Sequence, residues 1–239
     1  MNERDYHDQH YAEEAALFTA PLFRRVHARA ARQFLRATGA GRAHRVLSLG
    51  CGDGSIERLL APRLGSVLGV DISAVAVEQA RARSARFANL AFKTGEGWAH
   101  GPYDAVAAFA FLHHLDDAAI RATLRAARAA LRPGGVFYSS DPSSRRLVGL
   151  FRGLVRKTYD RYHSPDEREL DPDVLAKLLE TEGFEKVQVS YTDYGLGPLA
   201  WLMPGAPRWL AAPLEGLDNL ALAVPLARRY ASSFSLCAS

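Results

Sequence analysis

Three glycines within five residues, between an apolar stretch and a helical pattern, constrain this chain more than any other feature. The apolar stretch covers 45–49, the loop reads Gly50-Cys51-Gly52-Asp53-Gly54, and the helical pattern begins at Ser55. Glycine lets a backbone approach a ligand closely, and the first turn of a helix offers free N–H groups to an anion. A strand, such a loop and a helix in this order are typical of ligand-binding turns in open α/β sheets, although a tight turn without a ligand has the same pattern.

Short apolar stretches alternate with helical patterns on both sides of this loop. We expect an opening helix over 11–38, strands near 45–49, 66–70, 90–92, 103–109 and 136–140, and helices from Ser55, from Ser73, over 117–131 and over 172–182. This alternation predicts a parallel sheet with helices on both faces, an α/β doubly wound fold. Two later stretches, 184–191 and 232–237, lack a crossover pattern, so we expect them to pair antiparallel at the sheet edge.

An acidic residue follows the second predicted strand. Asp71 comes directly after the strand 66–70 and lies 21 residues beyond Gly50. A carboxylate at the end of this strand can accept hydrogen bonds from both hydroxyls of a ribose, and such charge-assisted bonds are strong. Asp71 can instead cap the next helix, but Ser73 can also do that. A nucleoside ligand is therefore the better interpretation.

The dinucleotide fingerprint does not fit, because Ser55 stands where its third glycine belongs. The chain instead resembles the class I S-adenosylmethionine-dependent methyltransferases, in a subgroup that acts on small molecules and contains His-His-Leu. The resemblance rests on the segments 46–54, 70–73, 95–97, 103–115 and 131–135, in this order. It implies a Rossmann-like seven-stranded sheet with an antiparallel terminal strand, an N-terminal helical cap and a C-terminal insertion.

The resemblance also implies the cofactor S-adenosyl-L-methionine and a set of residues that would hold it. The implied cofactor residues are Gly50, Cys51, Gly52, Gly54, Asp71, Ile72, Glu96, Gly97, Phe109 and His114. One departure concerns the short aromatic stretch 97–101, where similar sequences have a small acidic segment. We expect a single methyltransferase domain over 1–239. Its predicted parts are a helical cap (1–41), a cofactor-binding core (42–142) and substrate-side insertions (143–170 and 195–231).

Two adjacent histidines follow the strand 103–109 on the ligand side of the sheet. His113 and His114 are candidate general bases, because imidazole titrates near neutral pH. A cofactor contact for one and packing for the other is the alternative. Asp116 and Asp117 resemble a paired-carboxylate site, but they precede an alanine-rich helix and are expected to cap it.

Candidate substrate residues come from the cap and from the insertions. They are Tyr6, Tyr11, Asp141, His163 and Trp201. The apolar segment 195–231 suits a pocket or lid, a dimer contact or a lipid contact. We expect methyl transfer to an O, N or C atom of a small, partly apolar acceptor, in specialised metabolism. The alternatives are an enzyme that couples methylation to another reaction such as cyclisation, and a non-catalytic partner subunit with the same fold.

Charge and cysteine usage exclude several other function classes. The chain of 239 residues has a formal net charge of +4, and 26 of its 30 basic residues are arginine. Two groups of four arginines recur at helical spacing, which is typical of solvent-exposed helix faces. They are Arg25, Arg29, Arg32 and Arg36, and Arg121, Arg125, Arg128 and Arg132. We expect no nucleic-acid partner, no bound metal, no transmembrane segment, a cytoplasmic location and a possible homodimer.

Overall fold

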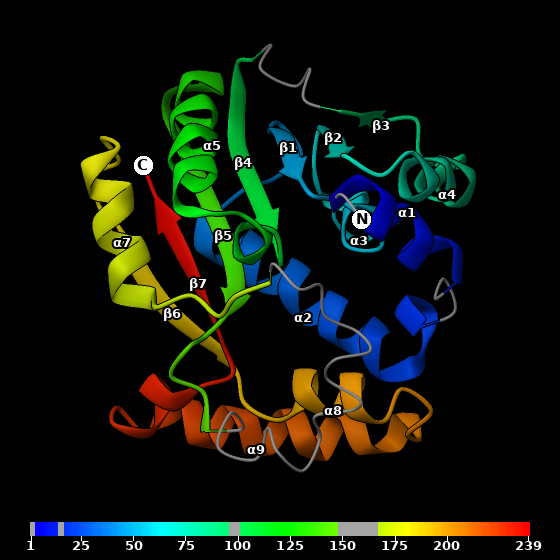
Figure 1. Cartoon of the computed structure of the whole chain (residues 1–239), viewed down its shortest axis with the longest axis vertical. Helices are drawn as coiled ribbons and strands as arrows, with labels where there is room; N and C mark the ends of the chain where they lie inside the picture. The colour runs from blue at the N-terminus through cyan, green and yellow to red at the C-terminus, as the bar shows by residue number, and fades with distance from the viewer. Residues whose placement is uncertain (1–2, 14–16, 96–100, 148–166) are drawn as a thin grey trace.

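Seven strands form one sheet in the computed structural model, which describes residues 3–13, 17–95, 101–147 and 167–239 (Figure 1). The strand order is β3-β2-β1-β4-β5-β7-β6. The strands are β1 (Arg45–Leu49), β2 (Ser66–Asp71), β3 (Leu90–Thr94), β4 (Tyr103–Phe109), β5 (Leu131–Pro142), β6 (Gln188–Asp193) and β7 (Ser233–Ala238). All neighbouring pairs are parallel except those of β7, which runs antiparallel to β5 and to β6. The predicted seven-stranded sheet with an antiparallel terminal strand is confirmed.

Helices cover both faces of this sheet. The α-helices are α1 (Glu3–Glu13), α2 (Pro21–Thr38), α3 (Glu57–Leu60), α4 (Ala74–Ser84), α5 (Asp117–Ala130), α7 (Pro172–Thr181), α8 (Leu196–Leu202) and α9 (Ala211–Ala223). The short 3-10 helices are η1 (Leu17–Thr19), η2 (Ala61–Arg63), η3 (Leu112–His114), η5 (Arg208–Leu210) and η6 (Ala227–Tyr230). Buried side chains of α5 and α7 form one core, and those of α2 and α3 form a second. This two-sided burial explains why the strands are apolar along both faces.

The direction in which the sheet grows changes beside β1. From β1 the chain adds β2 and β3 on one side and then returns to add β4 on the other. The loops after β1 and β4 therefore diverge and leave a crevice at the carboxyl ends of these strands, which is where open α/β sheets bind ligands. Gly50 follows β1 here, and Ala110 follows β4.

The predicted opening helix over 11–38 is wrong, because the chain forms α1, η1 and α2 in its place. Pro21 is the first residue of α2. Proline has no backbone N–H and favours the first turn of a helix, so it begins a helix more readily than it continues one. The predicted cap of α5 is present at Asp116, which accepts from the Ala119 N–H, whereas Asp117 is the first residue of that helix. Asp171 likewise accepts from the Asp173 and Val174 N–H groups at the start of α7.

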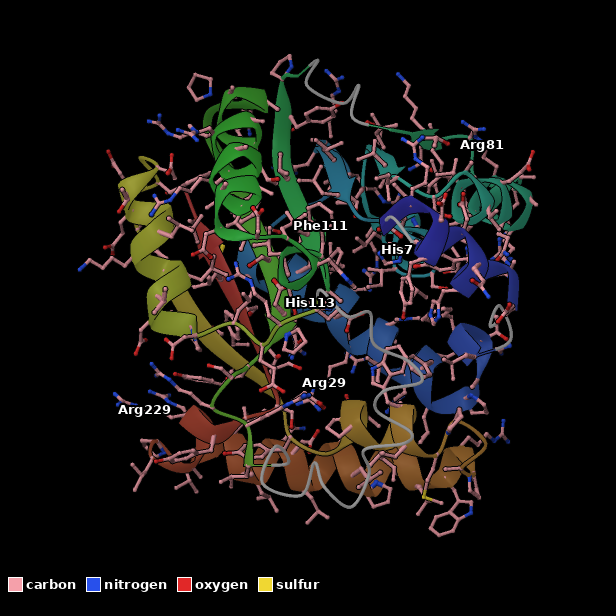
Figure 2. The ribbon with its side chains drawn as sticks, in the orientation of Figure 1. His7, Arg29, Arg81, Phe111, His113 and Arg229 are labelled. Atoms are coloured by element: carbon pink, nitrogen blue, oxygen red, sulfur yellow. The ribbon has the colours of Figure 1, made fainter. Side chains whose placement is uncertain are left out.

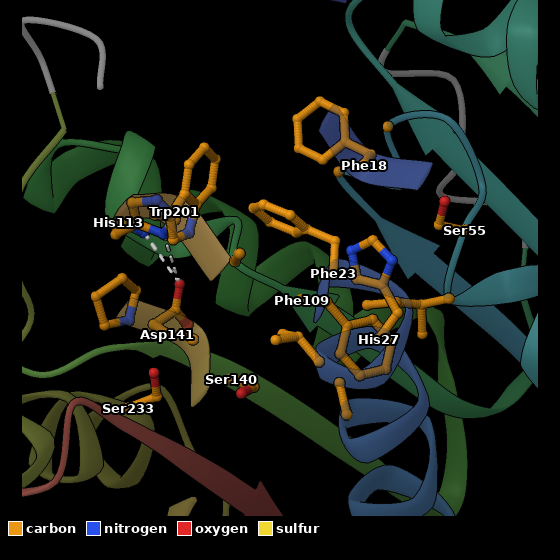
Figure 3. Close-up of a pocket in the computed structure, with 18 of the residues that line it drawn as sticks. Phe18, Phe23, His27, Ser55, Phe109, His113, Ser140, Asp141, Trp201 and Ser233 are labelled. Carbon is orange, nitrogen blue, oxygen red and sulfur yellow. Dashed lines mark hydrogen bonds and ion pairs between the residues drawn. The ribbon is translucent and has the colours of Figure 1, made fainter. Parts of the chain in front are cut away.

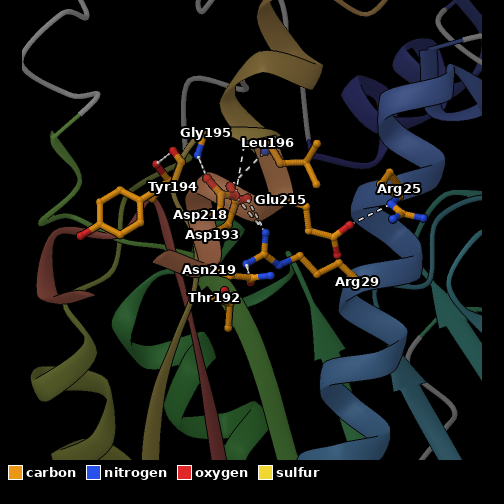
Figure 4. Close-up of polar contacts among 12 residues, drawn as sticks. Arg25, Arg29, Thr192, Asp193, Tyr194, Gly195, Leu196, Glu215, Asp218 and Asn219 are labelled. Carbon is orange, nitrogen blue, oxygen red and sulfur yellow. Dashed lines mark hydrogen bonds and ion pairs between the residues drawn. The ribbon is translucent and has the colours of Figure 1, made fainter. Parts of the chain in front are cut away.

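The interpretation of the first arginine group as a solvent-exposed face is wrong for Arg29. Its guanidinium is buried and lies 2.9 Å from Asp218 of α9 and 3.7 Å from Asp193 of β6 (Figure 4). Arg25 donates to Glu215 of α9 at 2.8 Å, and Arg32 pairs with the same carboxylate. This face of α2 therefore docks the C-terminal helices. In the second group, Arg121 and Arg125 are exposed as predicted and pair with Glu182.

The segment 195–231 folds into α8, η5, α9 and η6, and α8 packs against both α2 and α9. Of the insertion 143–170, only its two ends belong to the described ranges, and they meet where Ser143 and Leu170 form an isolated parallel bridge. Among the helices that the structure describes, each is too short or too polar to cross a membrane.

Candidate active site

The glycine loop has a backbone that only glycine adopts easily. Gly50, Gly52 and Gly54 have φ angles of 64°, 52° and 73°, a left-handed region that strains other residues. Space is also restricted, because a Cβ on Gly50 would overlap the ring of Phe111 and a Cβ on Gly52 would overlap the Tyr11 hydroxyl. The loop thus presents bare backbone to its surroundings, which is what a close-fitting ligand cradle requires.

Asp71 connects the end of β2 to this loop. Its Oδ2 accepts from the Gly52 N–H at 2.7 Å, and its Oδ1 accepts from the Ser73 N–H at 2.9 Å. Burial raises the pKa of this carboxyl, while these N–H donors act in the opposite direction. Each carboxylate oxygen has a second lone pair, so Asp71 can still accept from a ribose. Ile72 beside it is 37% exposed.

Helix α1 covers the loop from the solvent side. Asp8 accepts from the Ser73 hydroxyl at 2.5 Å and from the Val75 N–H at 3.3 Å, and Gln79 donates to the Tyr11 carbonyl at 2.8 Å. These contacts direct the Tyr11 side chain toward Gly52. Burial raises the pKa of the Tyr11 hydroxyl well above its usual range, and the nearby Asp71 charge adds to this effect. The hydroxyl therefore keeps its proton and can act as a donor.

A cavity of about 350 Å³ extends from the glycine loop to α8 (Figure 3). This volume is within the range of small-molecule sites. Its wall combines the glycine loop, the carboxyl ends of β4 and β5, and side chains of α1, α2 and α8. The predicted site residues that line it are Tyr6, Tyr11, Gly50, Cys51, Gly52, Phe109, His113, His114, Asp141 and Trp201. Gly54, Asp71 and Ile72 adjoin it without lining it, and Glu96, Gly97 and His163 lie outside the described residues.

Aromatic rings form a large part of the cavity wall. Trp201 of α8 packs edge to face on Phe23 at a centroid distance of 4.9 Å and on Phe18 at 6.2 Å. Phe109 at the end of β4 packs on Phe34 and Tyr138 and is buried. Such rings provide a rigid apolar surface that suits a flat or aliphatic ligand.

His113 and Asp141 form a pair at the base of the cavity. The His113 ring contacts Asp141 Oδ1 through Nδ1 at 3.1 Å, and the His113 backbone N–H donates to the same oxygen at 3.3 Å (Figure 3). When the Asp141 carboxylate accepts from Nδ1, that nitrogen holds the proton and Nε2 is left to act as a base. Asp141 Oδ2 is buried and has no hydrogen-bond partner among the described residues. A ligand in the cavity can supply a donor to it.

His114 belongs to the same group of rings. Its ring lies 4.1 Å from that of His113 and 5.0 Å from that of His7 on α1, and its Nδ1 is 3.6 Å from Glu167 Oε1. This arrangement links the cap helix to the β4 loop. Both predicted catalytic histidines therefore face one cavity, and the carboxylate beside His113 is fully buried.

One set of side chains in the cavity could hold a metal ion. His113, His114 and Glu167 have ligand atoms that all lie within 4.8 Å of one another. Imidazole and carboxylate are ligands for divalent cations such as Zn²⁺. However, Nδ1 of His113 already contacts Asp141, and Arg146 also lines this cavity. The set thus also suits proton transfer without a metal, and the sequence-based expectation of no metal stays a prediction.

Comparison with known proteins agrees with this geometry. A family model described as a methyltransferase domain matches residues 19–189. The chain belongs to this methyltransferase family. The expected class, that of class I S-adenosylmethionine-dependent methyltransferases, is thereby confirmed.

Individual members of the family are distant from this chain. It is 33% identical over 158 residues to a probable S-adenosylmethionine-dependent methyltransferase of Mycolicibacterium smegmatis, covering 64% of this chain and 56% of that protein. It is 25% identical over 158 residues to a ubiquinone biosynthesis O-methyltransferase of Idiomarina loihiensis, covering 61% and 63%. The matched region thus spans less than two thirds of the length of these relatives.

The fold can be compared over the whole chain. The solved structure of magnesium protoporphyrin IX methyltransferase from Synechocystis with bound SAH has a TM-score of 0.65 and 18% identity. The alignment covers 98% of this chain and 96% of that one. This likeness shows that the chain has the same overall fold as that protein over nearly its whole length.

Sequence reasoning missed two residues of this methyltransferase site. His27 on α2 lines the cavity, and burial lowers its pKa to about 4, so it is neutral near pH 7. The available signal was helical spacing, because His27 lies four residues after Phe23, which also lines the cavity. Glu57 at the start of α3 is 1% exposed and accepts from the Ser48 hydroxyl at 2.6 Å. Burial raises its pKa to about 7.

The raised pKa of Glu57 predicts a pH-dependent effect on stability. Because the folded state binds this proton more tightly than the unfolded chain, its contribution is fully present below about pH 4.5 and is lost as the pH rises through about 7. We expect the stability of Glu57→Gln relative to the parent to increase by about 2 kcal/mol between pH 5 and pH 7. Urea unfolding at both pH values measures this, with exposed Glu180→Gln as control. An equal difference at both values would contradict it.

Proposed function

We propose that this chain is an S-adenosylmethionine-dependent methyltransferase that methylates a hydroxyl oxygen of a small, partly apolar acceptor. The observation that carries the proposal is the His113–Asp141 pair, which lies in one cavity with the glycine loop. A histidine oriented by a carboxylate is useful when the acceptor holds its proton at neutral pH, as a phenol or an alcohol does. One relative is named an O-methyltransferase, which also supports an oxygen acceptor.

The residues present fit the cofactor that the family implies. Gly50 and Gly52 present bare backbone to the cavity, where Phe111 and Tyr11 leave no room for a Cβ, and Asp71 ends β2 beside them with lone pairs available for a ribose. S-adenosylmethionine supplies a methyl group on a sulfonium when it is bound. The Tyr11 hydroxyl, which keeps its proton, can donate to a ligand that contacts Gly52.

The opposite end of the cavity would hold the acceptor. Phe18, Phe23 and Trp201 provide apolar walls, and Tyr6 and Asp141 provide polar groups. His113 Nε2 would take the acceptor proton, and the Asp141 carboxylate would stabilise the imidazolium that results. Holding the two reactants next to each other in one cavity can by itself lower the activation barrier by roughly 7–11 kcal/mol when they are well oriented.

Several finer predictions accompany this proposal. The specialised-metabolism role, the cytoplasmic location, the absence of a nucleic-acid partner and the single-domain organisation stay predictions. Product mass distinguishes the alternatives: a gain of one methylene unit supports simple methylation, and any other change supports a coupled reaction such as cyclisation. Absence of both turnover and cofactor binding would support a non-catalytic partner subunit.

Loss of the Asp71 carboxylate tests the cofactor part of the proposal. We expect Asp71→Ala to weaken binding of S-adenosylhomocysteine by about tenfold or more, since it removes a charge-assisted contact and frees the Gly52 N–H that orders the loop. Isothermal titration calorimetry measures this effect. Asp173→Ala is the matched control, because that carboxylate is 67% exposed on α7 and pairs with Arg145, away from the loop. Unchanged affinity of Asp71→Ala would refute this assignment of the cofactor site.

A further inference from the structure

Helix α9 has its charged residues on the side that faces the protein. It contains two, Glu215 and Asp218. Glu215 pairs with Arg25 and Arg32, and Asp218 is 3% exposed and pairs with Arg29. A helix on the surface of a globular protein normally turns its charged face to solvent. The outward side of α9 is therefore left without charge.

The outward side and the turn that follows it are apolar. Leu217 is 63% exposed, Leu220 70%, Val224 51% and Leu226 72%. The preceding turn adds two further large side chains, Met203 at 56% and Trp209 at 69%. We call this set the α9 face. It belongs to the helices at the lower edge of the molecule in Figure 1. Leu217, Leu220 and Val224 follow one another at helical spacing, and an exposed apolar helix side of this kind is typical of an interaction site.

Charge at the border of the α9 face is positive. Arg208 precedes α9, and Arg228 and Arg229 follow it, all of them exposed. Figure 2 shows Arg229 at the periphery of the molecule. Over 195–231, the acidic residues are Glu215 and Asp218, which both pair with α2. The border therefore attracts anions and has no acidic side chain of its own to balance it.

We propose that the α9 face docks on the surface of a lipid bilayer that contains anionic lipids. An apolar helix side bordered by arginines, with an exposed tryptophan, matches the properties of helices that lie in the membrane interface. The arginines would contact the headgroups while the leucines enter the acyl boundary. A second copy of the chain fits less well, because a two-fold contact places the same face on both sides. Arginines would then meet arginines without an acidic partner from this segment.

Docking in this way would place the cavity close to the lipid. Helix α8 contacts α9 on one side, and its Trp201 and Leu202 line the cavity on the other. An apolar acceptor dissolved in the bilayer would then be one helix away from the cavity. This consequence rests on the proposed function, whereas docking itself does not.

Vesicle co-sedimentation of the full chain tests the proposal. We expect binding to vesicles of phosphatidylcholine with phosphatidylglycerol, weaker binding to pure phosphatidylcholine, and weakening by salt. Leu217→Glu/Leu220→Glu should abolish binding. Arg228→Gln/Arg229→Gln should lower the partition coefficient on anionic vesicles roughly 30-fold, since each arginine near such a surface contributes about a factor of five. Val174→Glu is the matched control, because Val174 is 68% exposed but lies on α7.

Two further measurements complete the test. Thermal unfolding reports whether each variant folds, and light scattering reports whether the parent chain and the leucine variant are monomers or dimers. Unfolding midpoints like that of the parent show that lost binding reflects the surface, and the arginine variant decides the question if the leucine variant does not fold. Failure of the parent chain to bind anionic vesicles would overturn the proposal. Equal binding by the arginine variant and the parent would overturn it as well. A parent dimer that Leu217→Glu/Leu220→Glu converts to a monomer, without vesicle binding by either, would assign the face to a second copy.

Discussion

Replacing His113 with asparagine is expected to lower kcat by about 10²–10⁴-fold, the contribution of a general base in the transition state. The asparagine side chain has no basic nitrogen, so the acceptor proton would have to leave to water. The binding constant for S-adenosylhomocysteine should change little, because His113 contacts Asp141 rather than the glycine loop. A methyl-transfer assay, run on an acceptor whose methylation is confirmed by product mass, measures kcat. Calorimetry with S-adenosylhomocysteine measures cofactor binding.

His114→Asn is the matched control for this prediction. Its ring lies beside that of His113 and lines the same cavity, but the structure orients it toward Glu167 rather than toward a fully buried carboxylate. A larger loss in His114→Asn than in His113→Asn would exchange their roles. Asp141→Asn should also lower kcat, because an amide cannot stabilise the imidazolium as a carboxylate does. Inhibition of the parent by EDTA would indicate that His113, His114 and Glu167 act on a metal instead.

Replacing Arg29 with methionine is expected to destabilise the fold by about 3–5 kcal/mol, the cost of removing one partner from a buried ion pair. The Arg29 side chain is 8% exposed and lies between Asp218 and Asp193. Burial, together with the hydrogen bond to Asp218 and its charge, raises the pKa of Asp193 well above its usual range. Arg29 is the cation that both of these buried carboxyl groups contact. Without Arg29, the Asp218 carboxylate would be buried without its cation.

Arg25→Met provides the comparison for this variant. It lies one turn earlier on α2, its side chain is 46% exposed, and it pairs with Glu215 at 2.8 Å. Because exposed pairs contribute little, we expect Arg25→Met to cost about 0–1 kcal/mol. Urea unfolding of both variants at one pH measures the difference. Equal losses would mean that Arg29 contributes no more than a surface pair and that α9 is held by its apolar contacts.

Local sequence was sufficient for the sheet and for the glycine loop. The strands 45–49 and 103–109 were predicted with the observed bounds, because each is an apolar stretch bounded by turn residues. The loop was recognised because the left-handed backbone at Gly50, Gly52 and Gly54 requires glycine. Helix boundaries were predicted less accurately near the N-terminus. The helical spacing of apolar residues continued through Pro21, but helix α2 begins at this proline, which has no backbone N–H to continue a preceding helix.

The candidate site was only partly predictable. His113 and Asp141 were each selected from their places after strands, but their contact across 28 residues depends on the parallel pairing of β4 with β5. His27 was missed because a histidine on a helix does not reveal whether it faces solvent or a cavity.

The sequence by itself determined the family, the order of the strands, and the residues available for a cofactor, because periodicity, glycine chemistry and motif order can be read along the chain. Only the tertiary structure decided the use of the arginines on α2. Their spacing is the same as that on α5, yet Arg29 is buried against Asp193 and Asp218 while Arg121 remains exposed. The difference arises because α9 returns from 189 residues away to cover one helix and not the other. Pairing its acidic residues with α2 also leaves the apolar side of α9 outward, a consequence of packing that no spacing in the sequence records.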